Sequence, residues 1–304
     1  MMRPKASLLF TITVAFFLLF ALSAGGLEIG GVFQMGNLGF QPDRPSTDTS
    51  ISGTDFLYGG SLYVRTDILE NFHVEAGYRR DLILRNVVYS LLQYQVDFFS
   101  LGVGMFVGFF NTGGSTINSG ITASIGLELP GAVFVSLHSD NPLASSLSES
   151  GDFSQRLINL ALGFYVKNAI CSFNLCSKEY SEMQGSTIIT DHLMKYSAKA
   201  DIYQKNVPFR LVLSFAYQTL DKKYLDGVTI TDQGLNSVLL GIEADFSIGS
   251  HLELFIGIED NLFTSGSGTL AGNNYIGITP YLFQAYTGFR LKFEQPAGKY
   301  RQDL

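Results

Sequence analysis

The chain has 304 residues, of which 15% are charged, and its formal net charge is −7. Ordinary soluble domains carry about 25% charged residues, so an ordinary soluble domain is disfavoured, and the acidic balance argues against binding nucleic acid. The only two cysteines lack zinc-site spacing, and we expect no metal and no cofactor.

The N-terminus has the pattern of a secretory leader. Arg3 and Lys5 precede an apolar run over 8–22, and the small residues of 23–25 follow it. The apolar run is too short to span a bilayer comfortably, so residues 1–24 are predicted to be a signal peptide for Sec export. An N-terminal membrane anchor is the alternative. The mature chain, residues 25–304, then forms one domain.

Apolar residues recur at every second position along the whole mature chain. The first strand is expected at 27–40. In the next segment Phe56, Tyr58, Leu62 and Val64 alternate with small or polar residues. The same period recurs at 72–79, 121–128, 133–137, 158–166, 169–178, 194–202, 209–218, 237–246, 251–259 and 285–293. A period of two predicts β-strands with one apolar face.

The longest apolar run after the leader, 98–110, has two interpretations. With 13 residues it is shorter than a membrane helix, and a buried helix is one alternative. Gly102, Gly104 and Gly108 share one parity, which favours a strand. A tight reversal near 97–100 is then needed to keep the alternation of connections described next.

Short and long connections alternate along the chain. Short turns are expected at 67–71, 130–131, 167–168, 205–208 and 248–250, and longer polar loops at 41–54, 139–153, 181–190, 221–234 and 264–274. Short periplasmic turns and long outer loops are typical of an outer-membrane barrel. The predicted fold is therefore all-β, a transmembrane antiparallel up-and-down barrel of about 14 strands, with 12 as the alternative. Asn168 should then be periplasmic, and Ser145 and Ser265 external.

The two cysteines illustrate the strand geometry. Cys171 and Cys176 are an odd number of residues apart, so on one strand their side chains point to opposite faces. Cys171 shares the apolar parity and Cys176 the polar one. A disulfide needs Cα atoms within about 7 Å, so both cysteines are predicted to be free.

Aromatic residues mark both ends of the expected apolar belt. Phe209 and Tyr217 share the apolar parity of one strand and lie roughly 20 Å apart along the membrane normal. The last strand ends with Phe289, Leu291 and Phe293 on one parity. It resembles the C-terminal signal of bacterial outer-membrane β-barrels, but an 11-residue tail follows Phe293. The resemblance implies insertion by the barrel-insertion machinery into outer-membrane lipids, and no specific family is identified.

One constellation resembles a hydrolase site. Ser136, His138 and Asp140 share a strand face, and outer-membrane lipid hydrolases use Ser and His on barrel strands. Same-face neighbours stand nearly 7 Å apart, however, and these three side chains face the lumen rather than lipid. We therefore predict that the chain is not an enzyme.

Charged side chains on the inward parity are the candidate pore-lining residues. Glu243, Asp245, Glu253 and Glu259 form an acidic wall on two adjacent strands, flanked by basic strands. Cross-strand ion pairs and a selectivity filter both remain open as the role of these charges. The complete set is Arg65, Arg79, Glu128, Lys195, Lys199, Arg210, Glu243, Asp245, Glu253, Glu259, Arg290 and Lys292.

Strand number leads from fold to function. Barrels of 8 strands fill with side chains, whereas those of 16–18 leave an aqueous pore, so about 14 should leave a narrow one. The expected function is a porin-like channel for passive diffusion of small hydrophilic solutes in the bacterial outer membrane. The alternatives are a non-conducting surface or structural barrel, and a FadL-like transporter of hydrophobic substrates.

Overall fold

The computed structural model describes residues 26–36, 57–81, 83–109, 117–144, 146–204, 207–227, 229–270, 273–275 and 283–294. The expected signal peptide 1–24 and the expected loop 41–54 lie outside these ranges, as does Ser145. Within the described residues, no helix is long and apolar enough to cross a membrane.

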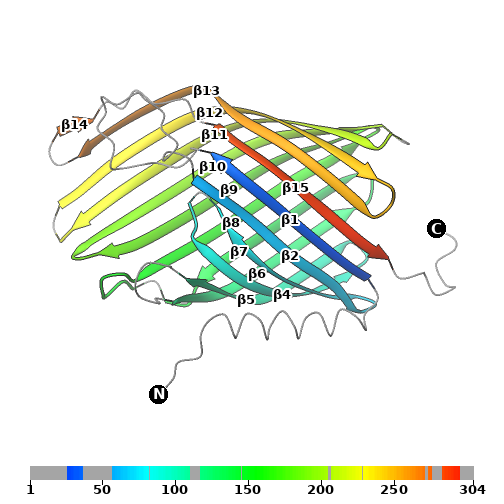
Figure 1. Cartoon of the computed structure of the whole chain (residues 1–304), viewed down its shortest axis with the longest axis horizontal. Helices are drawn as coiled ribbons and strands as arrows, with labels where there is room; N and C mark the ends of the chain where they lie inside the picture. Colours follow the sequence, from blue (N-terminus) through cyan, green and yellow to red (C-terminus); the bar gives the residue numbers. More distant parts are fainter. Residues whose placement is uncertain are drawn as a thin grey trace, which may run out of the picture.

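Antiparallel strands follow one another around a closed barrel (Figure 1). The strands are β1 Gly26–Gly36, β2 Leu57–Leu69, β3 Phe72–Arg80, β4 Asn86–Val96, β5 Phe99–Phe109, β6 Ile117–Leu129, β7 Val133–Pro142, β8 Phe153–Val166, β9 Ala169–Gln184, β10 Thr187–Tyr203, β11 Phe209–Asp226, β12 Thr229–Ile248, β13 Leu252–Leu270, β14 Asn273–Tyr275 and β15 Phe283–Glu294. Closure comes from pairing of β1 with β15, the blue and red strands of Figure 1. The short β14 pairs only with β13 and stays outside the ring, so the barrel has 14 strands, which confirms the predicted fold class and strand number.

The tight reversal predicted near 97–100 is confirmed. β4 and β5 pair from Val96↔Phe99 onward, so the chain turns within two residues. Asp97 adopts a φ of 45° there, in the left-handed region that an Asp tolerates better than most residues. The strand favoured for the run at 98–110 is present as β5, Phe99–Phe109.

Alternate exposure along β5 identifies the lipid-facing surface. Leu101, Val103 and Met105 are 48%, 58% and 58% exposed, whereas Phe106 on the opposite parity is 1% exposed. Aromatic pairs lie at both ends of this apolar belt, Phe209–Phe246 and Phe72–Tyr94 near one end and Phe33–Tyr58 near the other. The outward face is thus an apolar band between two aromatic girdles, as a membrane-spanning barrel requires.

We call the two ends of the barrel the turn end and the loop end. The turn end holds the short connections at 70–71, 97–98, 130–132, 167–168 and 249–251, and both Gly26 and Glu294. Asn168 lies at the turn end and Ser265, on β13, toward the loop end. The predicted separation of these two positions is therefore present.

Two expected loops prove to be strand. β9 and β10 pair up to Gln184↔Thr187, and β11 and β12 pair up to Asp226↔Thr229, so residues 181–190 and 221–234 are hairpins rather than loops. The expected loop 264–274 is likewise mostly strand, since β13 runs to Leu270. Both faces of these extensions carry polar residues, so the alternation that reveals a half-buried strand is weak there. The result is a tall wall, β9 to β13, opposite a lower one (Figure 1).

Inward aromatic rings cover glycines on the neighbouring strand. An added Cβ on Gly163 would lie 2.3 Å from ring atoms of Phe134, its direct cross-strand partner. Five further inward pairs share this arrangement: Tyr63 with Gly30, Tyr89 with Gly77, Phe106 with Gly120, Phe255 with Gly288 and Tyr286 with Gly257. Each ring therefore lies flat against the wall, which shields a glycine backbone that has no side chain of its own.

Candidate functional site: a divided lumen

The interior of the barrel changes character from the loop end to the turn end. Toward the loop end it is packed, and Leu220 and Leu239 are both 0% exposed. Toward the turn end a cavity of about 710 Å³ opens inside β4–β12. We call this cavity the vestibule. The two halves are described in turn.

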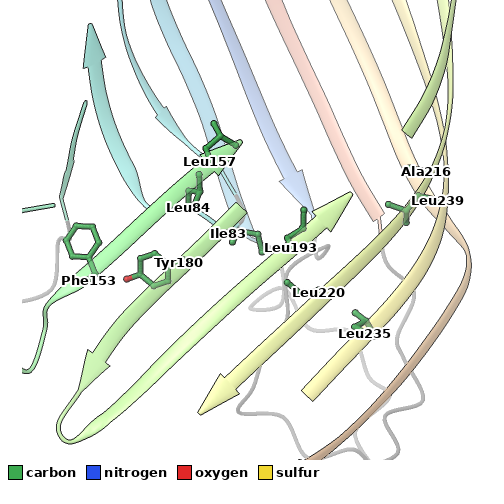
Figure 2. Close-up of a cluster of buried hydrophobic side chains, with 10 residues drawn as sticks. All are labelled: Ile83, Leu84, Phe153, Leu157, Tyr180, Leu193, Ala216, Leu220, Leu235 and Leu239. Atoms are coloured by element: carbon green, nitrogen blue, oxygen red, sulfur yellow. The ribbon is translucent and has the colours of Figure 1, made fainter. Parts of the chain in front are cut away.

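A segment between β3 and β4 crosses the lumen. We call residues 81 and 83–85 the strap. Ile83 and Leu84 are 8% and 4% exposed and belong to an apolar cluster on the inner face of the tall wall. Figure 2 shows them beside Leu157 and Leu193. Because six strands separate β4 from β11, which contributes Leu220 to the cluster, this cluster joins opposite sides of the barrel.

Polar contacts hold the strap on the β8–β9 side. One Asp81 oxygen accepts from the backbone N–H groups of Ile83 (2.8 Å) and Leu84 (2.6 Å) and the other pairs with Lys178 Nζ at 2.6 Å. The Arg85 N–H donates to Gln155 Oε1 at 3.0 Å, and its guanidinium lies 5.0 Å from the centroid of the Tyr180 ring. The strap is therefore both packed and hydrogen-bonded.

Cys176 belongs to the same packed half. It is half-buried and contacts the apolar cluster, and both cysteines are free. This placement confirms that Cys176 faces inward and that the pair forms no disulfide.

An ion-pair network runs around the turn-end wall. Arg210 contacts Asp245 at 2.6 Å, Asp201 at 3.4 Å and Glu253 at 3.5 Å. Arg290 continues the network to Glu253 at 2.5 Å, and reaches Glu28 at 3.6 Å. The predicted acidic wall is thus interleaved with guanidinium groups.

Further inward charges also pair across strands. Lys195 Nζ lies 2.5 Å from Glu259, although β11 and β12 separate their strands. Arg65 pairs with Glu75 at 2.6 Å. Arg79 on β3 forms an ion pair with Asp140 on β7, although β4, β5 and β6 separate these two strands. Such contacts neutralise charges that leave bulk water.

The predicted pore-lining residues separate into three groups. Glu128, Lys199, Arg210 and Glu243 line the vestibule. Arg65, Arg79, Lys195, Asp245, Glu253, Glu259 and Arg290 form the ion pairs above. Lys292 is at the turn end, where its N–H donates to the His251 carbonyl oxygen at 2.8 Å.

The Ser136, His138 and Asp140 constellation is partly assembled. His138 Nε2 lies 3.5 Å from Asp140 Oδ1, and Asp140 forms an ion pair with Arg79. Ser136 lines the vestibule, and no hydrogen bond joins its hydroxyl to His138 among the described residues. A nucleophile needs its base within hydrogen-bond reach, so the geometry offers no support for a hydrolase.

The strap and the role of Asp140 are not among the sequence-based expectations. One signal for the strap was available, because Leu157, Leu193 and Leu220 are apolar residues on the inward parity of polar-lined strands. Buried leucines on a lumen face require a covering partner. A second signal is the apolar sequence within the short β3–β4 connection.

No protein-family model matches the chain, and no curated protein matches its sequence. Among solved structures it is similar to OmpTdeltaL8, a loop-deletion mutant of an outer-membrane protein of Vibrio cholerae, at 10% identity and a TM-score of 0.41, covering 88% of this chain and 100% of that one. It is also similar to a bacterial polysaccharide outer-membrane secretin, at 10% identity and a TM-score of 0.46, covering 88% of this chain and 98% of that one. A mutant of the Rh. blastica porin is similar at 12% identity and a TM-score of 0.36, covering 88% of this chain and 99% of that one.

The chain is an outer-membrane-type β-barrel. That statement rests on the closed sheet, the apolar belt and the aromatic girdles. β15 ends at Glu294 in register with Gly26. Solute and gating have to be argued from the lumen itself.

Proposed function

We propose that the barrel is a porin-like channel in the bacterial outer membrane for passive diffusion of small hydrophilic solutes. The observation that carries the proposal is the vestibule, whose lining is rich in charged groups and hydroxyls. A wall of this kind needs water or a polar solute, because polar groups without partners are costly to bury. The strap makes the channel narrow at the loop end.

Export, orientation and assembly are parts of the same proposal. The segment 1–24 directs Sec export, the turn end faces the periplasm, and β15 is read by the insertion machinery. Cysteine substitution at 168 and at 265, followed by labelling of intact cells with a membrane-impermeant maleimide, tests the orientation. Labelling at 265 alone is expected, and labelling at 168 alone would show that the barrel has the opposite orientation.

A non-conducting surface barrel is the second candidate. The complete burial of Leu220 and Leu239, on strands that should border the pore, favours it. A FadL-like transporter of hydrophobic substrates fits the vestibule poorly, because the lining is rich in charged groups and hydroxyls.

Planar-bilayer recording separates the two candidates. Refolded mature protein should give small discrete conductance steps, and Asp81→Ala should enlarge them because it removes the Lys178 contact and both backbone contacts of the strap. Asp152→Ala is the matched control, since this acid lies in the external connection before β8. Folding is verified by heat-modifiable mobility on gels. Folded wild type and Asp81→Ala that both fail to conduct would favour the non-conducting barrel.

A further inference from the structure

The vestibule contains a preformed aromatic surface. Phe134 points inward from β7, and its ring lies flat on Gly163 of β8. Because one face of the ring covers the backbone, the other face is turned toward the vestibule, which Phe134 lines. A glycine at 163 is what permits this orientation, since any larger residue would lift the ring off the wall.

Tyr165 extends this surface along β8. Its ring centroid lies 5.9 Å from that of Phe134 at an interplanar angle of 62°. Its hydroxyl donates to Glu128 Oε1 at 2.5 Å, which fixes the ring. Both residues line the vestibule. Two rings held in place by a backbone contact and a hydrogen bond lose little conformational entropy when a ligand binds.

The other side of the vestibule offers hydrogen-bond donors and acceptors. Lys199 forms no ion pair with any residue in the described part of the chain. Its direct neighbours across the strands are Ser172 and Ser214, and Ser172 also lines the vestibule. The carboxylates of Asp201 and Glu243 complete this side.

The mixture of signs limits the solutes that fit. An anion drawn to Lys199 would approach Asp201 and Glu243, and a cation drawn to those carboxylates would approach Lys199 and Arg210. A neutral solute with many hydroxyls can instead donate to the carboxylates and accept from the ammonium group without such repulsion. The flat Phe134 ring adds an apolar contact that suits a molecule with one apolar face.

We propose that the vestibule is a binding site for a small neutral saccharide. Its apolar ring face stacks on Phe134, Tyr165 borders the edge of the sugar, and its hydroxyls bind Lys199, Ser172 and Glu243. The inference rests on the proposed channel only for its role as a transit site, because binding itself needs no conduction. The cavity volume of about 710 Å³ is within the usual range for small-molecule sites.

Saturation-transfer NMR tests binding directly in protein refolded into detergent micelles. Maltose, cellobiose and glucose are the probes, with spermidine and glutamate as charged comparisons. We expect transfer to at least one sugar, and about tenfold weaker affinity in Phe134→Leu, which keeps an apolar side chain but removes the aromatic face. Phe106→Leu is the matched control, because this ring also covers a glycine but is 1% exposed in the packed half.

The same sugars are then added to the bilayer recordings. Sugar binding without conductance supports the site and overturns the passive channel. Conductance with no binding of any sugar supports the channel and overturns the site. Equal sugar affinity in wild type and Phe134→Leu, or tighter binding of spermidine or glutamate than of every sugar, would also overturn the saccharide assignment.

Discussion

Gly163→Ala should destabilise the barrel through the ring of Phe134. The new Cβ would lie 2.3 Å from two ring atoms and 3.0 Å from the Cys171 carbonyl oxygen, which is backbone and cannot move freely. The ring must therefore leave the wall. Overpacking of this kind costs typically 1–3 kcal/mol, and the lower entropy of the unfolded chain with alanine offsets about 0.4–1 kcal/mol. A net loss of about 0–2.6 kcal/mol, with a midpoint near 1.3 kcal/mol, follows.

Equilibrium urea unfolding of the barrel in lipid vesicles measures this loss. Phe134→Leu serves as the second arm of a double-mutant cycle, because a smaller side chain leaves room for the new methyl group. The cycle should give a coupling energy between the two positions of about 1 kcal/mol. Gly126→Ala is the control, since the one close contact of its Cβ would be the flexible Ser100 hydroxyl, at 2.4 Å, and its contact with backbone, at 3.9 Å, is an ordinary one. Additive effects at 163 and 134 would refute the flat-ring argument.

Three other predictions concern the packed half and the connection before β8 at the loop end. With Cys171 replaced by serine, Cys176 should react slowly with a water-soluble maleimide and several-fold faster in Asp81→Ala, because release of the strap uncovers the apolar cluster. Leu220→Ala should lower the free energy of unfolding by about 2–5 kcal/mol, since this side chain is 0% exposed. The backbone N–H groups of Ser148 and Glu149 donate to the Asp152 carboxylate at 3.0 and 2.9 Å, and these bonds lower the pKa of that carboxyl. The connection should therefore be ordered above the unfolded-state pKa of Asp152 and loosen as pH falls through the lowered pKa. Hydrogen exchange measures this change.

Each of these three has its own control and contradicting result. Equal Cys176 labelling with and without Asp81 would mean that the strap covers nothing. Leu213→Ala, on the lipid-facing parity of β11 and 41% exposed, should cost clearly less than Leu220→Ala, and an equal cost would place Leu220 outside a packed interior. An exchange rate at residues 148–149 with the same pH dependence in Asp152→Ala would exclude the carboxylate as the cause.

How much the sequence could reveal depended on the solvent at each strand face. Where one face meets lipid and the other a polar lumen, as along β5, alternation fixed the strand and its parity. Above the membrane both faces are polar, and there the hairpins β9–β10 and β11–β12 were mistaken for loops. Asp226-Gly227 was a usable signal, since Asp-Gly is typical of tight hairpin turns and Gly227 has a φ of 60°.

The interior was harder to predict because its contacts join strands far apart in the chain. Parity predicts that Arg210 and Arg290 face inward, but it cannot tell which carboxylate each one meets. Arg79 and Asp140 illustrate the difficulty, since their pairing depends on the width of the closed barrel. The strap depends on the same long-range geometry.

The junction of β1 and β15 has a consequence for chain topology. Gly26 lies in register with Glu294, and both ends of the described barrel are at the turn end. Residues 26 and 294 could thus be joined by a short linker, and the chain opened instead at Asn168, without removing any strand pairing. Such a circular permutant would keep every ladder of the sheet but begin with β9 and finish with β8. The order in which the strands are synthesised would then be separated from the order in which they stand around the barrel.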